Sequence, residues 1–208
     1  MRLLPRLEPI IASAPPKLVI GFSDITALGC LLWKYGVPWL HAPLLTSVAY
    51  EPDETRAHAL SIAAGDGRFK RLVGETTIRP GRCDGRLVGG SLSLLSAMVG
   101  TPYMPDLTDP ILFIEDIGEK AYRLDRMWQQ LLLAGCLRGV AGVVLGYLTK
   151  CDEGLEVMSE LISALNVPAA RGFGFGHEAP NWAVPFGGRA AFDADSKSVV
   201  FESEIVIP

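Results

Sequence analysis

A serine stands on a predicted turn between a strand and a helix. Ser23, in "LVIGFSDITAL", follows an apolar run that ends at Gly21 and precedes a helical apolar pattern. A serine on such a turn can present its hydroxyl to a substrate, and amide N–H groups at a helix N-terminus can stabilise an oxyanion. However, Ile25 stands where the G-x-S-x-G pattern has its second glycine. Taken alone, the position favours a simpler interpretation, in which Ser23 or Asp24 caps the helix.

Carboxylates follow a second apolar run. Glu115 and Asp116 end "ILFIED", and Glu119 lies just beyond them. A carboxylate behind a histidine can fix the tautomer of that histidine and stabilise the imidazolium form. Acids are also favoured at the N-terminus of a following helix, where they need no catalytic role. Both interpretations stay open at this point.

Histidine is the usual general base, and the chain contains only three. His177 lies in the glycine-rich loop "GFGFGHEAP", where the backbone has freedom to present a base. His58 falls in a polar helical pattern and is expected to be solvated, whereas His41 follows a short strand and could be a satisfied, partly buried group. The order serine, acid, histidine is that of α/β-hydrolases, although geometry rather than order defines a triad. The spacing alone is compatible with a serine hydrolase and does not identify the substrate.

The elements that would position these residues alternate between strands and helices. Helical patterns cover 24–35, 53–65, 91–99, 121–135 and 153–165, and β-type runs cover 17–21, 38–41, 86–90, 110–116 and 139–148. The Gly/Pro-rich tail after 165 shows hairpin signals. We therefore predict an α/β protein with an N-terminal domain over 1–70, a polar junction at 71–85 and a C-terminal α/β domain with a β-rich end over 86–208.

Composition limits the classes of partner. The 208 residues include 49% hydrophobic and 20% charged residues, which is enough to bury a core. A net charge of -4 without a dense Lys/Arg block argues against nucleic acid or an anionic membrane surface. No apolar stretch is long enough for a membrane helix, and Pro5, Arg6 and Glu8 interrupt the part that mimics a signal peptide. The four cysteines form no C-x-x-C pair and no metal-binding spacing, which predicts a reducing compartment, the cytoplasm.

Several separated motifs, taken together, resemble the LD-carboxypeptidase family of serine peptidases, which includes the microcin C immunity peptidases. They occur in family order: "GFSDITAL", "HAP", "GRLVGGSLSLL", "GTPY", "ILFIEDIGEKAYRLDRMWQQLLLAG" and "GFGFGHEAPNWAVPFGGRAAFD". The resemblance runs from about residue 3 to residue 201. It implies that Ser23 is the nucleophile, His177 the general base and Glu115 the orienting carboxylate, with Glu119 the less favoured acid. The Asp24 N–H would help to hold the oxyanion, and no metal or cofactor is implied.

Two departures from the family pattern affect these expectations. Ser91 stands where an asparagine is expected, which puts a polar role of that side chain in doubt. Family members also begin with a further α/β segment ahead of the "RLLP" that forms residues 2–5 here. That segment would carry a glycine-rich loop with an oxyanion donor. The resemblance thus implies a partial Rossmann-like N-terminal domain that lacks its first units.

The implied activity is that of a cytoplasmic, homodimeric LD-carboxypeptidase. Such an enzyme would remove the terminal D-alanine of murein tetrapeptides by cutting an L–D amide bond during cell-wall recycling. One alternative is a microcin-immunity-like hydrolase of aminoacyl–nucleotide conjugates, for which the short stretch 66–85 leaves little room for a nucleotide-binding loop. The other is an inactive or binding-only fragment.

Overall fold

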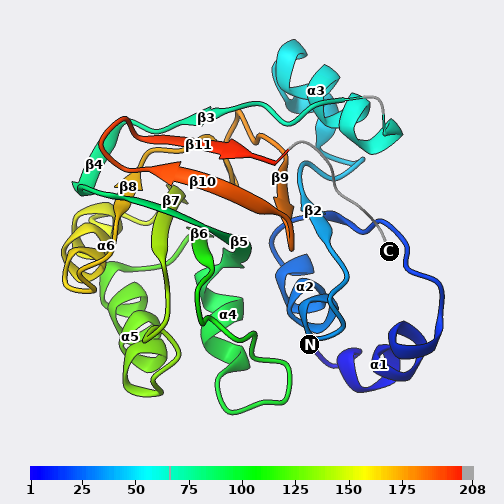
Figure 1. Ribbon diagram of the computed structural model, residues 1–208, viewed down its shortest axis with the longest axis horizontal. Coiled ribbons are helices and arrows are strands. Elements are labelled where there is room, and N and C mark those ends of the chain that lie inside the picture. Colours follow the sequence, from blue (N-terminus) through cyan, green and yellow to red (C-terminus); the bar gives the residue numbers. More distant parts are fainter. Residues whose placement is uncertain (66, 203–208) are drawn as a thin grey trace.

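The computed structural model describes residues 1–65 and 67–202 and arranges them in two sheets with flanking helices (Figure 1). The helices are α1 (Leu4–Ser13), α2 (Ile25–Lys34), the short 3₁₀ helix η1 (Val48–Tyr50), α3 (Asp53–Ala64), α4 (Leu92–Met98), α5 (Ala121–Leu133) and α6 (Gly154–Ser163). The strands are β1 (Ile20–Gly21), β2 (Trp39–His41), β3 (Leu72–Val73), β4 (Thr76–Arg79), β5 (Arg82–Ser91), β6 (Ile111–Ile117), β7 (Gly142–Thr149), β8 (Ala169–Arg171), β9 (Val184–Phe186), β10 (Arg189–Asp193) and β11 (Ser198–Phe201). The predicted α/β class and the β-rich end are confirmed.

The larger sheet has eight strands in the order β3-β11-β10-β5-β6-β7-β8-β4. Strands β5 to β8 are parallel, and the other neighbours pair antiparallel. Although β3 and β4 are consecutive in the chain, they lie at opposite ends of this order. Between them, the Gly74 N–H donates to the Lys197 carbonyl and the Glu75 N–H donates to the Arg171 carbonyl, each at 2.8 Å. The sheet therefore curls so that its two edges approach each other.

The central strand β6 is buried on both faces, as its continuous apolar sequence requires. Leu112 and Ile114 pack with the helices on one side of the sheet. Ile111 and Phe113 point to the other side, where they join a cluster of aromatic rings inside the curl. Helices α4, α5 and α6 cover one face of the parallel strands (Figure 1). The carboxyl end of β6 is thus held rigidly between two cores.

The smaller sheet joins distant parts of the chain. Strands β1 and β2 are parallel with α2 between them, and β9 pairs antiparallel with β2 (Figure 1). In this pairing Trp39 lies opposite Phe186, and their rings pack with centroids 4.9 Å apart. A segment from the C-terminal half therefore completes the sheet that precedes Ser23.

Two segments differ from their sequence-based interpretation. Residues 71–85, predicted as a polar junction, form β3, β4 and the start of β5, because their β-branched residues pair with strands far along the chain. The division into domains at this stretch stays a prediction. Helix α1 was not predicted. Pro5 is tolerated in its first turn, and Glu8 binds Lys34 of α2 at 2.6 Å, so the helix depends on tertiary contacts.

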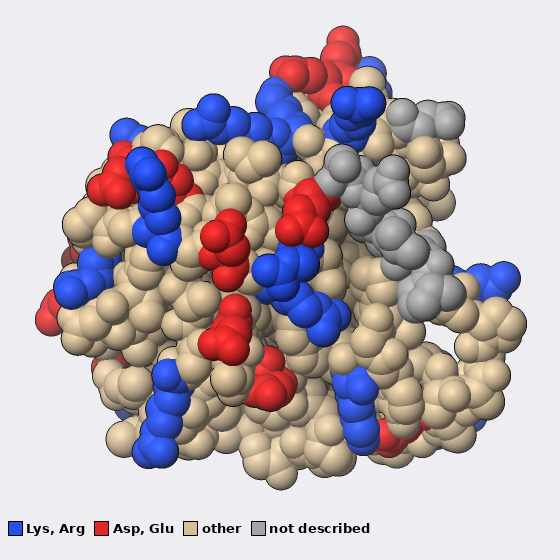
Figure 2. All heavy atoms as spheres, viewed as in Figure 1, with Lys and Arg blue, Asp and Glu red and all other residues tan. Residues whose placement is uncertain are grey.

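Charged side chains of both signs are interspersed on the face that Figure 2 shows. This view shows no broad field of one sign, in keeping with the net charge of -4. Within residues 1–65 and 67–202, none of the helices combines the length and the apolar character needed to cross a membrane.

Candidate active site

Ser23 lies on a strained turn between β1 and α2. Its φ of +58° is in the left-handed region, which a residue with a side chain rarely adopts. Helix α2 begins at this turn. Its first backbone hydrogen bonds run from the Ile25 N–H to the Phe22 carbonyl and from the Thr26 N–H to the Ser23 carbonyl. Strain of this kind persists only where the surroundings impose it, and it is typical of a nucleophile on a sharp strand-to-helix turn.

The capping interpretation finds no support in this turn. The N-cap position is occupied by Asp24, which is exposed and makes no side-chain capping bond within the described residues. The left-handed φ of Ser23 also differs from the extended backbone that a capping residue usually has. Close packing explains the glycine at position 21, because a Cβ atom there would lie 2.7 Å from Ile25 Cγ1.

Glu115 and His177 form a close pair at the end of β6. Glu115 is fully buried, and its Oε2 lies 2.6 Å from Nδ1 of His177. A proton on Nδ1 donates this hydrogen bond and leaves Nε2 free to accept another proton. Burial raises the pKa of Glu115, and the hydrogen bond from His177 acts in the opposite direction. The pair has the arrangement of a general base and its orienting carboxylate.

Glu119 does not share this position. Its carboxylate pairs with the Arg123 guanidinium, with 2.5 Å between Oε2 and Nε. Of the two acids that the sequence offered, Glu115 is therefore the one in contact with His177. The end of β6 fixes the direction of Glu115, whereas Glu119 lies beyond Gly118.

Aromatic rings connect His177 to the serine turn. The Phe22 ring lies edge-on to the His177 ring, with centroids 4.8 Å apart, and Phe22 directly precedes Ser23. His41, at the end of β2, lies 6.0 Å from the Phe22 ring and 5.7 Å from the Phe175 ring. The loop that carries His177 thus packs against the Ser23 turn.

His41 differs from its expected environment. It is completely buried, and neither ring nitrogen has a hydrogen-bond partner among the described residues. Burial, with a smaller contribution from His177, lowers the pKa of His41 to about 3. His58 was expected to be solvated but is half-buried, with its ring 5.4 Å from the Trp182 ring.

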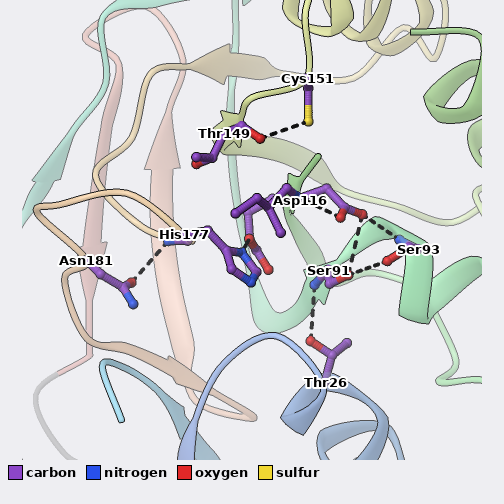
Figure 3. Close-up of polar contacts among 11 residues, drawn as sticks. Thr26, Ser91, Ser93, Asp116, Thr149, Cys151, His177 and Asn181 are labelled. Atoms are coloured by element: carbon purple, nitrogen blue, oxygen red, sulfur yellow. Dashed lines mark hydrogen bonds and ion pairs between the residues drawn. The ribbon is translucent and has the colours of Figure 1, made fainter. Parts of the chain in front are cut away.

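A network that the sequence did not predict ties the serine turn to the large sheet (Figure 3). The Ser91 N–H at the end of β5 donates to Thr26 Oγ1 over 3.1 Å. The Ser91 hydroxyl lies 2.8 Å from Ser93 Oγ and 3.4 Å from Asp116 Oδ2, and the Ser93 N–H donates to the same carboxylate oxygen. Although Ser91 replaces the expected asparagine, its side chain is engaged in hydrogen bonds.

The two consecutive glycines before Ser91 are the feature of the sequence that could have predicted this close contact between β5 and α2. Gly90 has a φ of +124°, and a Cβ atom there would lie 2.3 Å from Thr26 Oγ1. Only glycine allows β5 to approach α2 so closely. Through these contacts the carboxyl ends of β5 and β6 lie beside the turn that carries Ser23. A serine, a histidine and a carboxylate are the residue types that acyl transfer uses. Within residues 1–65 and 67–202, no group of three or more His, Cys, Asp or Glu side chains is placed to hold a metal ion.

Comparison with known proteins gives consistent similarities. Residues 84–192 match the family described as LD-carboxypeptidase C-terminal domain. A probable murein peptide carboxypeptidase from Bacillus subtilis is 35% identical over 211 residues, covering 91% of this chain and 64% of the relative. A murein tetrapeptide carboxypeptidase from Pseudomonas aeruginosa is 32% identical over 213 residues, covering 93% of this chain and 69% of the relative.

A solved structure extends the similarity to the fold. The crystal structure of a MccF-like protein from Bacillus anthracis str. Ames superimposes with a TM-score of 0.82 and 25% identity, covering 98% of this chain and 73% of that one. The chain spans 64% to 65% of the length of three curated relatives that are 34% to 36% identical to it, just under two thirds.

Proposed function

This chain belongs to the LD-carboxypeptidase family, and from this premise we propose that it is a serine-type LD-carboxypeptidase. Its substrate would be a murein tetrapeptide, from which it releases the terminal D-alanine by hydrolysing the L–D amide bond. We further propose that it acts in the cytoplasm as a homodimer, without metal or cofactor.

In the proposed reaction, Ser23 Oγ attacks the carbonyl carbon of the scissile amide while Nε2 of His177 accepts the hydroxyl proton. The oxyanion is held by backbone N–H groups, including that of Asp24. When the tetrahedral intermediate collapses, the C–N bond breaks and the imidazolium gives its proton to the amine of departing D-alanine. Water then attacks the acyl carbon while Nε2 of His177 accepts a proton from it. The bond from this carbon to Ser23 Oγ breaks, the imidazolium returns its proton to Oγ, and the shortened peptide leaves with a new carboxyl group.

Glu115 supports each of these steps through His177. It keeps the proton on Nδ1 and stabilises the imidazolium that forms during each attack. The observation that carries the proposal is the 2.6 Å contact between Glu115 and His177, with the His177 ring packed against the residue before Ser23. The strained turn of Ser23 adds support.

The test is release of D-alanine from a purified murein tetrapeptide, measured beside Ser23→Ala. We expect turnover by the wild-type chain and none by the variant, with both folded by circular dichroism. Equal release by the two proteins would refute the assignment of Ser23. A folded wild-type chain that neither releases D-alanine nor reacts with a serine-directed phosphonate would instead support an inactive or binding-only fragment.

A second candidate function is hydrolysis of an aminoacyl–nucleotide conjugate. A solved structure of the microcin C7 self-immunity protein MccF, 25% identical to this chain with a TM-score of 0.79, is in complex with aspartyl sulfamoyl adenosine, and this similarity favours including the second candidate. Parallel assays with the tetrapeptide and an aminoacyl-adenylate analogue separate the two substrates. Preference for the nucleotide conjugate would replace the first substrate while leaving the proposed roles of Ser23, His177 and Glu115 unchanged.

A further inference from the structure

A buried amide holds the loop that carries His177. Asn181 is 1% exposed, and its Oδ1 accepts a hydrogen bond of 3.0 Å from the Gly176 N–H (Figure 3). Its own backbone N–H donates to Oε2 of Glu51, also over 3.0 Å. Glu51 lies outside the loop, directly after η1. Asn181 therefore connects the backbone beside His177 to a different part of the chain.

Gly176 is held between this amide and the buried acid. Its φ is +119°, and a Cβ atom there would lie 3.0 Å from both Cβ and Oε2 of Glu115. Its N–H donates to Asn181 Oδ1. Since His177 is the next residue, the position of the Gly176 peptide sets where the imidazole meets Glu115. A displaced peptide would lengthen or misalign the 2.6 Å contact.

We propose that Asn181 is a positioning residue for His177, acting through the Gly176 N–H, with Glu51 fixing Asn181 from outside the loop. This inference rests on the proposed role of His177 as the general base. Asn181 itself takes no part in bond making. Its contribution is to hold the peptide before His177 where the Nδ1–H meets the Glu115 carboxylate.

The loop has other attachments that allow this role to be tested separately from folding. The Trp182 N–H donates to the Gly174 carbonyl over 2.8 Å. The Trp182 ring lies 3.8 Å from Nζ of Lys70 and 5.4 Å from the His58 ring. Removing the Asn181 amide therefore leaves the loop anchored on both sides of His177.

The decisive measurement is the imidazole ¹H–¹⁵N spectrum of His177, recorded across pH for the wild type and Asn181→Ala. With three histidines in the chain, a His177→Gln variant assigns the signals. We expect the Nδ1–H signal of the Glu115 contact to weaken and the tautomer to become mixed in Asn181→Ala. In D-alanine release we expect kcat to fall about 10²-fold, the usual effect of a small displacement of a catalytic group. KM should change less than about threefold, because substrate contacts are untouched.

Asn181→Asp tests whether the acceptor atom is what matters. Its carboxylate can still accept from the Gly176 N–H, so we expect the Nδ1–H signal and most of kcat to return.

Thr77→Val is the matched control, since it removes a hydrogen bond of 2.6 Å from Thr77 Oγ1 to the Ala194 carbonyl. It should leave both the His177 spectrum and kcat unchanged. If Asn181→Ala does not fold, Glu51→Ala is the deciding variant, and a weakened Nδ1–H signal is expected there too.

A wild-type His177 spectrum in Asn181→Ala, or in Glu51→Ala where that variant decides, would overturn the inference. So would an Asn181→Asp variant as impaired as Asn181→Ala. If the wild-type chain hydrolyses no substrate, the proposed function fails, while the spectra still decide whether Asn181 positions His177.

Discussion

Replacing His41 by phenylalanine should make the protein more resistant to acid. In the folded protein burial lowers the pKa of His41 to about 3, whereas an unfolded chain has a histidine pKa of about 6.5. Between these values the unfolded state binds the extra proton, so the free energy of unfolding falls as the pH is lowered from 6.5 towards 3. The stabilising effect of a neutral His41 is fully present above pH 6.5.

The size of the effect follows from the two pKa values. At about pH 4.5, two units below the unfolded value, the loss is about 3 kcal/mol, at 1.36 kcal/mol per unit. His41→Phe removes this proton uptake and keeps a ring among Phe22, Trp39, Phe175 and Phe186. It also removes two buried nitrogens that lack partners among the described residues, a change that can be neutral or stabilising.

The assay is urea unfolding followed by tryptophan fluorescence at pH 7.5 and about pH 4.5, for the wild type, His41→Phe and a His58→Phe control. Wild type and variant share all their carboxylates, so the difference between them isolates His41. We expect the wild type to lose about 3 kcal/mol more than His41→Phe on acidification, and His58→Phe to behave more like the wild type because His58 is only half-buried. Equal acid losses in the wild type and His41→Phe, within about 1 kcal/mol, would refute the burial argument.

Four further substitutions test the candidate site. Ser23→Ala should abolish labelling by a serine-reactive phosphonate and lower turnover by more than about 10⁴-fold; labelling that persists on another serine, detected by mass spectrometry, would show that the nucleophile lies elsewhere. Glu115→Gln should keep the fold by circular dichroism but lower kcat by about 10²- to 10⁴-fold, because the amide favours the wrong tautomer of His177. Glu119→Gln should be mild, and a dead Glu119→Gln beside an active Glu115→Gln would exchange the two acids. Gly176→Ala should lower the free energy of unfolding by about 1–3 kcal/mol, because its φ of +119° strains any residue with a side chain; unchanged stability would contradict the close approach to Glu115.

Local patterns in the sequence were sufficient for much of the framework. The apolar run, Gly21 and the helical periodicity after Ser23 predicted a strand–turn–helix, and the structure has one. The run before Glu115 predicted a buried strand ending in acids, which is β6. These features depend on the periods of strands and helices, so they can be read from neighbouring residues. The family motifs then selected Ser23, Glu115 and His177 as the candidate site.

Contacts between distant segments were decided only by the tertiary structure. Strands β3 and β4 exist because they pair with β11 and β8, 90 to 127 residues later in the chain. The burial of His41 depends on rings from β9 and from the loop before His177. Asn181 gave no local signal either, because its partners are a backbone N–H and a carboxylate 130 residues away. Such pairings depend on how distant strands and loops come together in the folded chain, and no local period in the sequence encodes these contacts.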